Sequence, residues 1–356
     1  MSLLFRYLFQ RHARLLMLIM GLGLGLYLLT ELVERVDIFI DNGAGLDLVL
    51  KYFACRLPGI VAQILPAVFL LATVVTLSLM GSSRELTALH AGGVSFARVA
   101  FILVLCGLFW GGVQFSCSQF IGVQGDRQAS QIWQEQVRKR DTSSKSVSDV
   151  WFKEDGWIVS IDSLRQDGKG RGFTAYHVKN VQDSEVDVIV RAPKVTGSTE
   201  GWTAHSPVIV RPASFERKEV DSFVIPVSQD PKLFFNNSSM SLQQLPIWQL
   251  DDAIRQLGSA GSNVEGLRTV WHGKIAYAAS LMVMALLGAA IVSWSSNIYV
   301  AVAISIGGTF MLYTMTMFGE SLGMRGALPP MAAAWGPDVL LLLVATIRLY
   351  MVSVRR

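Results

Sequence analysis

Charged residues are scarce in this chain, at 16% of its 356 residues, whereas hydrophobic residues make up 51%. A water-soluble globular domain has about 25% charged residues, so much of this surface must face lipid instead of water. The net charge of +4 is spread along the chain without a basic block, and this excludes the footprint of a nucleic-acid-binding protein. The composition predicts a membrane protein.

Residue patterns typical of metal-binding, nucleotide-binding or catalytic sites are equally scarce. The five histidines are scattered without the spacing of metal ligands, and Gly273-Lys274 lacks the upstream glycine loop of a nucleotide-binding P-loop. The three cysteines lie in or beside hydrophobic runs, where small apolar residues are common: Cys55, Cys106 and Cys117. We find no catalytic constellation and expect no metal or cofactor to be bound by this chain. Any energy source has to come from another subunit.

Long hydrophobic runs, in contrast, occur six times. Each is long enough, at about 20 residues, for a helix to cross the hydrocarbon core of a bilayer, which is about 30 Å thick. The predicted spans are residues 15–33, 58–80, 98–121, 271–293, 298–318 and 328–350. An even number of crossings returns the C-terminus to the side on which the chain begins.

Arginines mark that side as the cytoplasm. They lie before the first span, between the second and third, and after the sixth: Arg6, Arg11, Arg14, Arg84, Arg98, Arg348, Arg355 and Arg356. By the positive-inside rule both termini are therefore cytoplasmic. The polar stretch between the third and fourth spans then lies in the periplasm, which places the protein in the inner membrane of a bacterium with two membranes.

That polar stretch, residues 142–245, alternates in the manner of β-strands. Residues 151–153 and 157–161 flank an Asp-Gly turn at residues 154–156, which is a hairpin signal. Further strands are expected at residues 173–178, 186–192, 202–204, 208–210 and 223–227. Short strands with turns between them are typical of a sandwich or jelly-roll-like fold.

The predicted architecture is a helical membrane protein with three spans on each side of an inserted periplasmic all-β domain of jelly-roll-like form. Its parts are residues 1–141 with the first three spans, residues 142–245 with the β-domain, and residues 246–356 with a connector and the last three spans. Amphipathic helices are expected on both sides of the β-domain, at residues 126–140 and 245–257.

A short helix is predicted in the loop between the second and third spans, at about residues 82–93. Ser82 is placed to cap it with Glu85 three residues later, while Gly92 and Gly93 supply the stop. Such a helix reaches about 14 Å and cannot span, so it lies on the membrane face or in a groove of another protein. The simpler alternative is a connecting helix in which Glu85 only caps.

Ionisable residues cluster at the outer ends of two spans. Charges at mid-bilayer cost about 2.5–3.5 kcal/mol each, so they point to function when present. Glu31 and Arg35 are one helical turn apart and can pair, which allows either a structural salt bridge or a contact with substrate. The same two interpretations apply to the remaining candidates, which are Glu34, Asp37, Glu320 and Arg325.

Over nearly its whole length the chain resembles the lipopolysaccharide-export permease family LptF/LptG. The resemblance rests on the order of spans around a β-domain, on residues 83–93, which look like the family's coupling helix, and on residues 150–156, which are similar to the first hairpin of its jelly roll. Residues 32–37 and 322–330 look more like LptG, whereas residues 89–91 are closer to LptF. We expect the LptG type.

The resemblance implies a set of partners. They are a second permease of LptF or LptG type, a dimer of the ATPase LptB that uses ATP and Mg²⁺, LptC at the lateral gate, and the periplasmic bridge protein LptA, with lipopolysaccharide as substrate. Glu85 would be the carboxylate that docks into the ATPase groove, with Arg84, Leu86, Leu89 and His90 beside it. The first and fifth spans would help to form a lipid-filled cavity.

The chain departs from the family pattern at one place. Family members can use basic side chains near the outer end of the first span to meet lipid A phosphates, but here Arg35 is the one basic residue beside Glu31, Glu34 and Asp37. The phosphates are therefore expected to be met by the partner subunit or elsewhere.

Other classes of protein remain open at this stage. A membrane-anchored sensor or scaffold would need no nucleotide and would tolerate Glu85→Ala. An integral membrane enzyme acting on lipid would need a cluster of His, Asp or Glu at one membrane surface, which the sequence does not assemble. A lipoprotein-type permease would usually have four spans, and the second hydrophobic triplet argues against it.

Overall fold

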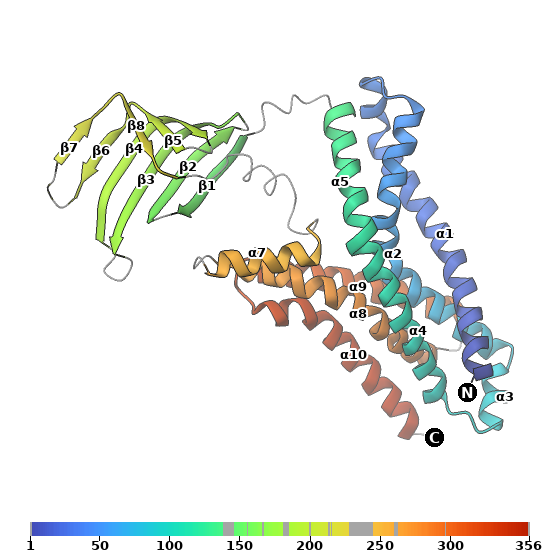
Figure 1. Cartoon of the computed structure of the whole chain (residues 1–356). Helices are drawn as coiled ribbons and strands as arrows, with labels where there is room; N and C mark the ends of the chain where they lie inside the picture. The colour runs from blue at the N-terminus through green and yellow to red at the C-terminus, as the bar shows by residue number, and fades with distance from the viewer. Residues whose placement is uncertain are drawn as a thin grey trace. The chain divides into compact units, whose positions relative to one another are not determined.

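Long helices and one β-sheet make up the computed structural model of this chain (Figure 1). It describes residues 2–137, 146–154, 156–165, 167–180, 185–198, 201–212, 214, 216–227, 245–259, 263–295 and 297–354. The chain divides into two units. The helical unit comprises Met1–Arg138 and Leu242–Arg356, and the β-unit comprises Lys139–Ser241.

Each of the six predicted spans corresponds to a helix, although the sixth begins at Pro330 and the third passes from α4 into the π-helix η1. The described part of the chain contains six helices long and apolar enough to cross a membrane. The elements of the helical unit are α1 (Ser2–Asp41), α2 (Leu46–Ser82), α3 (Glu85–Ala91), α4 (Phe96–Ser116), η1 (Cys117–Gly122), α5 (Val123–Gln131), η2 (Ile132–Val137), α7 (Ile247–Ser259), α8 (Glu265–Trp294), α9 (Ile298–Met324) and α10 (Pro330–Val354).

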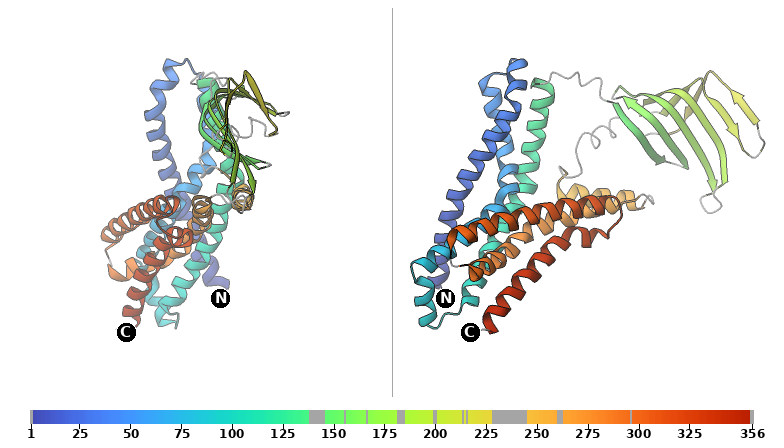
Figure 2. Two further views of the ribbon diagram at one scale, coloured as in Figure 1. Left: turned by 90° about the vertical axis from the view of Figure 1, so that its left-hand side faces the viewer. Right: turned by 180° about the vertical axis from the view of Figure 1, so that it is seen from behind.

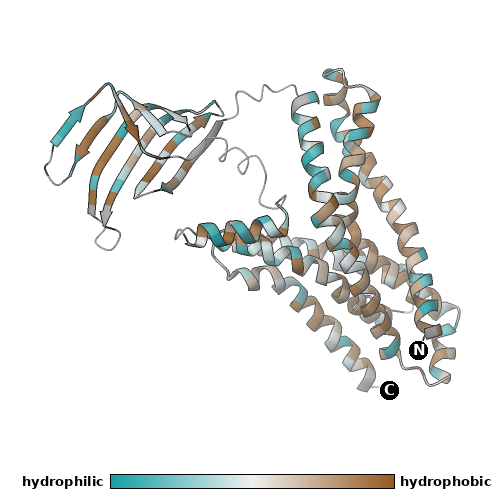
Figure 3. Ribbon diagram, in the orientation of Figure 1, coloured by the Kyte–Doolittle hydropathy of each residue, from teal (hydrophilic) through white to brown (hydrophobic). Residues whose placement is uncertain are grey.

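Some helices are much longer than a bilayer requires. At 1.5 Å per residue, the 40 residues of α1 reach about 60 Å, twice the thickness of the hydrocarbon core. Apolar residues run along most of α8, α9 and α10, while polar residues gather on α5 and α7 (Figure 3). The predicted amphipathic helices correspond to α5 with η2 and to α7, although residues 138–140 of that prediction lie outside the described residues.

Two helices form the centre of the helical unit and two lie at its margin. The most apolar window is 67% buried in α2 and 61% in α8, but 17% in both α1 and α9. Close packing of α4 on α8 depends on glycines: a Cβ at Gly107 would lie 2.7 Å from the carbonyl oxygen of Leu281, and one at Gly111 2.6 Å from that of Ala278. Small residues let membrane helices approach closely.

Both ends of the chain lie at the same end of the helical unit as α3 (Figures 1 and 2). This is the arrangement that an even number of crossings predicts. The short helix α3 joins the ends of α2 and α4 there, and the start of α1 runs beside it (Figure 2).

The β-unit is built around one antiparallel sheet. Its strands are β1 (Ser146–Glu154), β2 (Trp157–Arg165), β3 (Lys169–Asn180), β4 (Glu185–Ser198), β5 (Gly201–His205), β6 (Val208–Arg211), β7 (Glu216–Glu219) and β8 (Ser222–Ile225). Neighbours pair in the order β1-β2-β3-β4-β5-β8, and β6 pairs with β4 and carries β7. The expected strands are all present, whereas β7 was not predicted. The jelly-roll form remains a prediction.

The strand pattern places apolar side chains on one side of the central strands. Val159 and Ile161 on β2 are buried, as are Phe173 on β3 and Trp202 on β5, and they pack into a single apolar cluster. Gly156 takes a positive φ of 81° in the turn between β1 and β2, as the Asp-Gly hairpin signal predicts. Alternation between core and solvent leaves the opposite side chains free to form a polar face.

Candidate functional site

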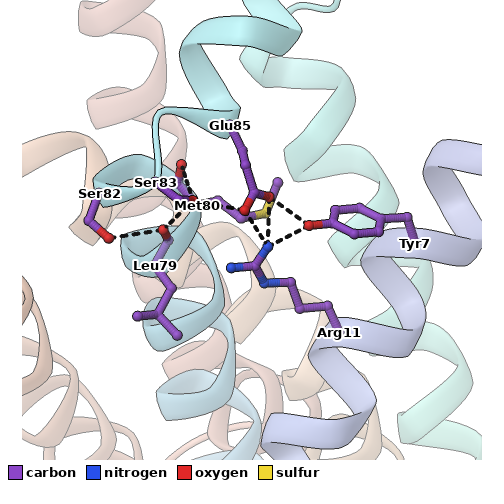
Figure 4. A network of polar contacts seen from close by, with 7 residues as sticks. All are labelled: Tyr7, Arg11, Leu79, Met80, Ser82, Ser83 and Glu85. Atoms are coloured by element: carbon purple, nitrogen blue, oxygen red, sulfur yellow. Dashed lines mark hydrogen bonds and ion pairs between the residues drawn. The ribbon is translucent and has the colours of Figure 1, made fainter.

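Glu85, the first residue of α3, accepts hydrogen bonds from two different helical segments (Figure 4). Nη1 of Arg11 lies 2.7 Å from Oε1 and 2.6 Å from Oε2 of the carboxylate. The Tyr7 hydroxyl donates to Oε2 at 2.7 Å, and the Ser83 hydroxyl donates to Oε1 at 2.8 Å. We call these four residues the Glu85 cluster. It ties the start of α1 to the short helix α3.

The start of α3 differs from the predicted capping box. Ser82 is the last residue of α2, and its hydroxyl donates to the carbonyl of Leu79. The N-cap position is held by Arg84 in the left-handed conformation, with φ of 60° and no side-chain cap. The prediction of a Ser82 cap was therefore wrong, because α2 continues to that residue. The predicted stop is present, since Gly92 is the C-cap and Gly93 has φ of 80°.

Glu85 is held ionised by its neighbours. The Arg11 guanidinium, with help from the hydroxyls of Tyr7 and Ser83, lowers the pKa of Glu85 from its ordinary 4.5 to about 2, although partial burial acts in the opposite direction. About a third of the carboxylate side chain is still exposed. An ion pair of this exposure contributes about 1 kcal/mol to stability, so a competing cation can replace Arg11 at low cost.

A groove of about 330 Å³ lies beside this carboxylate and is lined by Tyr7, Glu85, Ala88 and Leu89. The other predicted contact residues are divided between two environments. Leu86 and Leu89 are half-buried and pack against the apolar core of the helical unit, and the His90 ring lies 6.5 Å from that of Phe96. Arg84 is exposed. The helix therefore presents Arg84, Glu85 and Ala88 outward and anchors itself with its leucines.

A second carboxylate cluster lies near the opposite end of α1. Glu31 is only 6% exposed, and its Oε1 pairs with Arg35 and with Arg56 of α2, both at 3.2 Å. The guanidinium carbon of Arg35 lies 4.5 Å from the ring centroid of Trp133, and the Tyr52 hydroxyl donates to Glu31 at 3.4 Å. We call these five residues the Glu31 cluster. The predicted Glu31–Arg35 pair is confirmed.

The remaining charged candidates are not brought together. Glu34 and Asp37 are exposed on α1, and neither forms an ion pair within the described part of the chain. Arg325 is exposed at the C-cap of α9. Glu320 instead points to a different feature, because it lines a cavity of the helical unit.

That cavity has a volume of about 650 Å³ and is bordered by helices from both halves of the chain. Its wall is mainly apolar, with hydroxyl, amide and charged groups between the apolar side chains. The lining residues are Tyr27, Gln63, Ile64, Gln114, Ser118, Thr269, Val270, Gly273, Lys274, Tyr277, Tyr313, Thr316, Met317, Glu320, Ala333 and Ala334. The first and fifth long helices, α1 and α9, therefore both contribute to its wall.

Pro66 of α2 accounts for one of the polar contacts in the cavity wall. Proline has no N–H, so within α2 the carbonyl of Ala62 loses its usual helical donor. The Gln114 side chain of α4 donates to that oxygen at 3.4 Å. The next carbonyl, of Gln63, accepts the hydroxyl of Tyr313 at 3.0 Å and that of Tyr277. Side chains of α4, α8 and α9 thus meet α2 one turn before Pro66.

Two clusters contain residues that the sequence did not assign to a site. Arg11 was assigned only to the positive cytoplasmic flank, and Arg56 was not singled out. Glu31 and Arg56 lie at nearly equal distances along the chain from the turn at Gly43, which has φ of 66°. Antiparallel helices joined by a tight turn bring such positions together, so this pair could have been found from sequence. The pairing of Arg11 with Glu85 is harder to predict, because the sequence indicates only that both residues lie on the same side of the membrane.

Comparison with protein families gives one result for this arrangement. A family model described as lipopolysaccharide export system permease LptF/LptG matches residues 6–351. The match includes all six long helices, α3 and every described strand. No curated protein matches the chain.

Proposed function

The chain belongs to the LptF/LptG family of lipopolysaccharide export permeases, and from this membership we propose that it is the LptG-type subunit, coupled through Glu85 to a separate ATPase. Members of this family are permease components of the ATP-driven lipopolysaccharide exporter and are transporter subunits, not enzymes. The chain is accordingly a multi-pass protein of the inner membrane, with six apolar helices.

The observation that supports the coupling proposal is the partly exposed carboxylate on a short helix beside a groove. Glu85 stands at the first turn of α3, next to the groove formed with Tyr7, Ala88 and Leu89. A helix that is anchored on one side by Leu86 and Leu89 can transmit a displacement to its neighbours without unfolding. Docking of α3 into a cationic pocket of an LptB-type dimer would then move α2 and α4, which α3 joins.

The cavity supports a substrate role for the helical unit. We propose that its apolar wall accepts acyl chains of lipopolysaccharide and that a second permease, of LptF type, completes it. The margins of the unit, α1 and α9, are its least buried long helices and both border the cavity. A helix of LptC would lie at this open side, and LptA would receive the lipid on the periplasmic side.

The same proposal assigns orientation. Both termini and α3 would face the cytoplasm, where the ATPase uses ATP and Mg²⁺, and the β-unit would lie in the periplasm. The Glu31 cluster would then be at the periplasmic end of α1. Its two arginines already share Glu31, which supports the expectation that lipid phosphates are met elsewhere.

The test is a purification of the tagged protein with its native partners in detergent, comparing wild type with Glu85→Ala. A matched control is Asp252→Ala, because Asp252 is an exposed carboxylate on α7, far from α3 in sequence. We expect ATPase activity to co-purify with wild type and with the control, and to be lost or uncoupled from lipopolysaccharide release in Glu85→Ala. Membrane insertion should be unchanged in all three.

Two outcomes would count against the proposal. Wild-type delivery of lipopolysaccharide to the outer membrane in cells with Glu85→Ala would remove Glu85 from coupling. Absence of an ATPase from every sample would favour the membrane-anchored sensor or scaffold instead.

A further inference from the structure

Basic side chains stand in register across one face of the β-unit. Arg171 of β3 lies directly opposite Lys194 of β4, and Lys194 lies opposite His205 of β5. We call these three residues the basic row. Ser163 of β2 continues the row on one side and Ser222 of β8 on the other. Since neighbouring strands are about 4.8 Å apart, the row presents cationic or polar groups at that interval.

Two more cations belong to the same face. Because side chains alternate along a strand, Arg165 shares a face with Ser163, and Lys169 shares one with Arg171. A hollow of about 610 Å³ lies over these strands, and its lining includes Arg165, Lys169, Arg171, Lys194, Thr196 and His205. The Thr196 hydroxyl and Nε2 of His205 are 2.9 Å apart. Four permanent cations and several hydroxyl groups thus surround one hollow.

Negative charge in the protein does not balance these cations. Among the described residues, no acidic side chain lines the hollow. Asp167, just outside it, pairs at 3.7 Å with Arg165 and at 3.9 Å with Lys169. Within the described part of the chain, neither Arg171 nor Lys194 forms an ion pair. Three net positive charges therefore remain around the hollow even with His205 neutral.

This arrangement is unfavourable for the β-unit alone. Like charges directly opposite each other on neighbouring strands are destabilising, yet Arg171 and Lys194 occupy such a position. An anion in the hollow would remove that repulsion. Guanidinium groups bind phosphate oxygens in pairs and ammonium groups bind them as point charges, while a concave basic surface raises the local concentration of anions.

We propose that the hollow binds the phosphate groups of a phosphorylated saccharide, with Arg171 and Lys194 as the principal ligands. The hydroxyls of Ser163 and Thr196 and the imidazole of His205 suit the sugar hydroxyls between phosphates. The ligand assignment rests on the proposed function, because the head group of the exported lipid is such a saccharide. The β-unit would then guide the head group while the membrane cavity holds the acyl chains.

The test measures binding to the full-length protein in detergent, so that both units are present. The first probe is fully deacylated lipopolysaccharide, a soluble phosphorylated oligosaccharide that has no acyl chains for the membrane cavity. The second is the same oligosaccharide after removal of its phosphates, and the third is inorganic pyrophosphate as a free phosphate source. Isothermal titration calorimetry at low and at physiological salt gives the affinity of each.

The variant R171S/K194S removes two cations from the hollow. The matched control R211S/K218S removes two exposed cations from β6 and β7 on the same unit, away from the hollow. A charge-preserving variant, R171K/K194R, tests whether charge suffices. We expect R171S/K194S to weaken binding of the phosphorylated probe at least tenfold, the control to change it less than twofold, and dephosphorylation to abolish the difference between the proteins.

A second measurement separates a binding role from a structural one. Without ligand, R171S/K194S should melt at the same temperature as wild type or higher, because the cross-strand repulsion is gone. The phosphorylated probe should raise the melting temperature of wild type and of R171K/K194R, but not that of R171S/K194S. If Arg171 and Lys194 only stabilised the fold, R171S/K194S would melt at a lower temperature than wild type without ligand.

Three results would overturn the proposal. Equal weakening in R171S/K194S and R211S/K218S would mean attraction by bulk charge without a site. Binding of pyrophosphate but not of the oligosaccharide would mean a site for free phosphate, unconnected with the exported lipid. If R171S/K194S bound every probe as tightly as wild type, the hollow would be excluded as the binding site. Failure of the coupling proposal would instead be seen in Glu85→Ala, which leaves the β-unit unchanged.

Discussion

Near each end of α1 a carboxylate is held by arginine, Glu31 of α1 itself at one end and Glu85 of α3 at the other, but water reaches the two carboxylates to different extents. Glu31 is 6% exposed and shares two arginines that also lie against the rings of Trp133 and Tyr52. The Glu85 side chain is 31% exposed and pairs with one arginine beside an open groove. The chemistry is the same, yet the two environments suit different tasks.

The difference follows from the cost of exchanging a partner. Breaking a buried ion pair leaves the remaining charges poorly solvated, which costs about 3–5 kcal/mol. An exposed pair contributes about 1 kcal/mol or less, because water replaces the lost partner. The Glu31 cluster is therefore suited to fixing α1 against α2, and the Glu85 cluster to releasing its partner when another cation arrives.

The largest effect is expected from Glu31→Gln. This change keeps the shape of the side chain but leaves Arg35 and Arg56 without their shared carboxylate. We expect a loss of about 3 kcal/mol in the free energy of unfolding, seen as a drop in the thermal denaturation midpoint of the detergent-solubilised protein.

Glu34→Gln is the matched control for that experiment. Glu34 is three residues away on the same helix and is exposed, so the same chemical change should leave the midpoint nearly unaltered. If both variants lowered the midpoint equally, Glu31 would be no more than a surface charge and the contrast between the two ends of α1 would be wrong.

The next effect concerns Arg11→Ala. If Glu85 serves an ATPase partner, removing Arg11 should destabilise the contact of α1 with α3 by only about 1 kcal/mol and should leave co-purifying ATPase activity within about twofold of wild type. Under the same conditions Glu85→Ala should lose the coupling. The measurement is ATPase activity and lipopolysaccharide release in the purified complex.

A different result would reverse the interpretation of this end of the molecule. Equal loss of coupling in Arg11→Ala and Glu85→Ala would mean that Glu85 acts by holding α1 to α3 and not by docking. Arg11→Lys then distinguishes charge from geometry, because lysine keeps the charge but not the planar group that approaches both carboxylate oxygens.

Regular elements were the part of the fold that sequence predicted well. Hydrophobic runs located all six long helices, and alternating apolar residues located seven of the eight described strands. The strand β7 has the sequence Glu-Arg-Lys-Glu and is wholly exposed, so it has no apolar alternation to detect. It forms because its backbone pairs with β6 at the edge of the sheet, and that tertiary cause leaves no local pattern.

The candidate sites were predicted only as far as local spacing reaches. Glu31 and Arg35 are one turn apart, so helical geometry alone predicts their pair. Arg11 is 74 residues from Glu85, and their contact depends on how α1 packs against α2 and where α3 leaves it. The prediction that Ser82 caps α3 was wrong for a related reason, because α2 continues through Ser82, the residue that spacing assigned to the next helix.

A smaller effect is expected from Tyr7→Phe. The variant removes one hydrogen bond to a charged group, which costs about 1 kcal/mol or more when the acceptor is left partly unsatisfied, but here Arg11 still satisfies it. We expect faster amide hydrogen exchange in α3 and little change elsewhere. Ser83→Ala is the control, because the Ser83 hydroxyl bonds Glu85 from the end of α2 and does not involve α1. Equal acceleration by both variants would show that Tyr7 does not tie α1 to α3.

The smallest effect concerns pH, and it sharpens the contrast at the exposed end of α1. The pKa of Glu85 is lowered to about 2 from 4.5, so its contribution to stability is complete above about pH 5 and is lost as the pH falls toward 2. The difference in melting temperature between wild type and Glu85→Gln should therefore be constant from pH 8 to 5.5 and shrink between pH 4.5 and 2. Asp252→Asn, titrated in parallel, corrects for acid effects on the rest of the protein. If the difference in melting temperature already shrank between pH 7 and 6, the pH dependence would belong to another group. If the difference stayed constant down to pH 3, Arg11 would not hold Glu85 ionised.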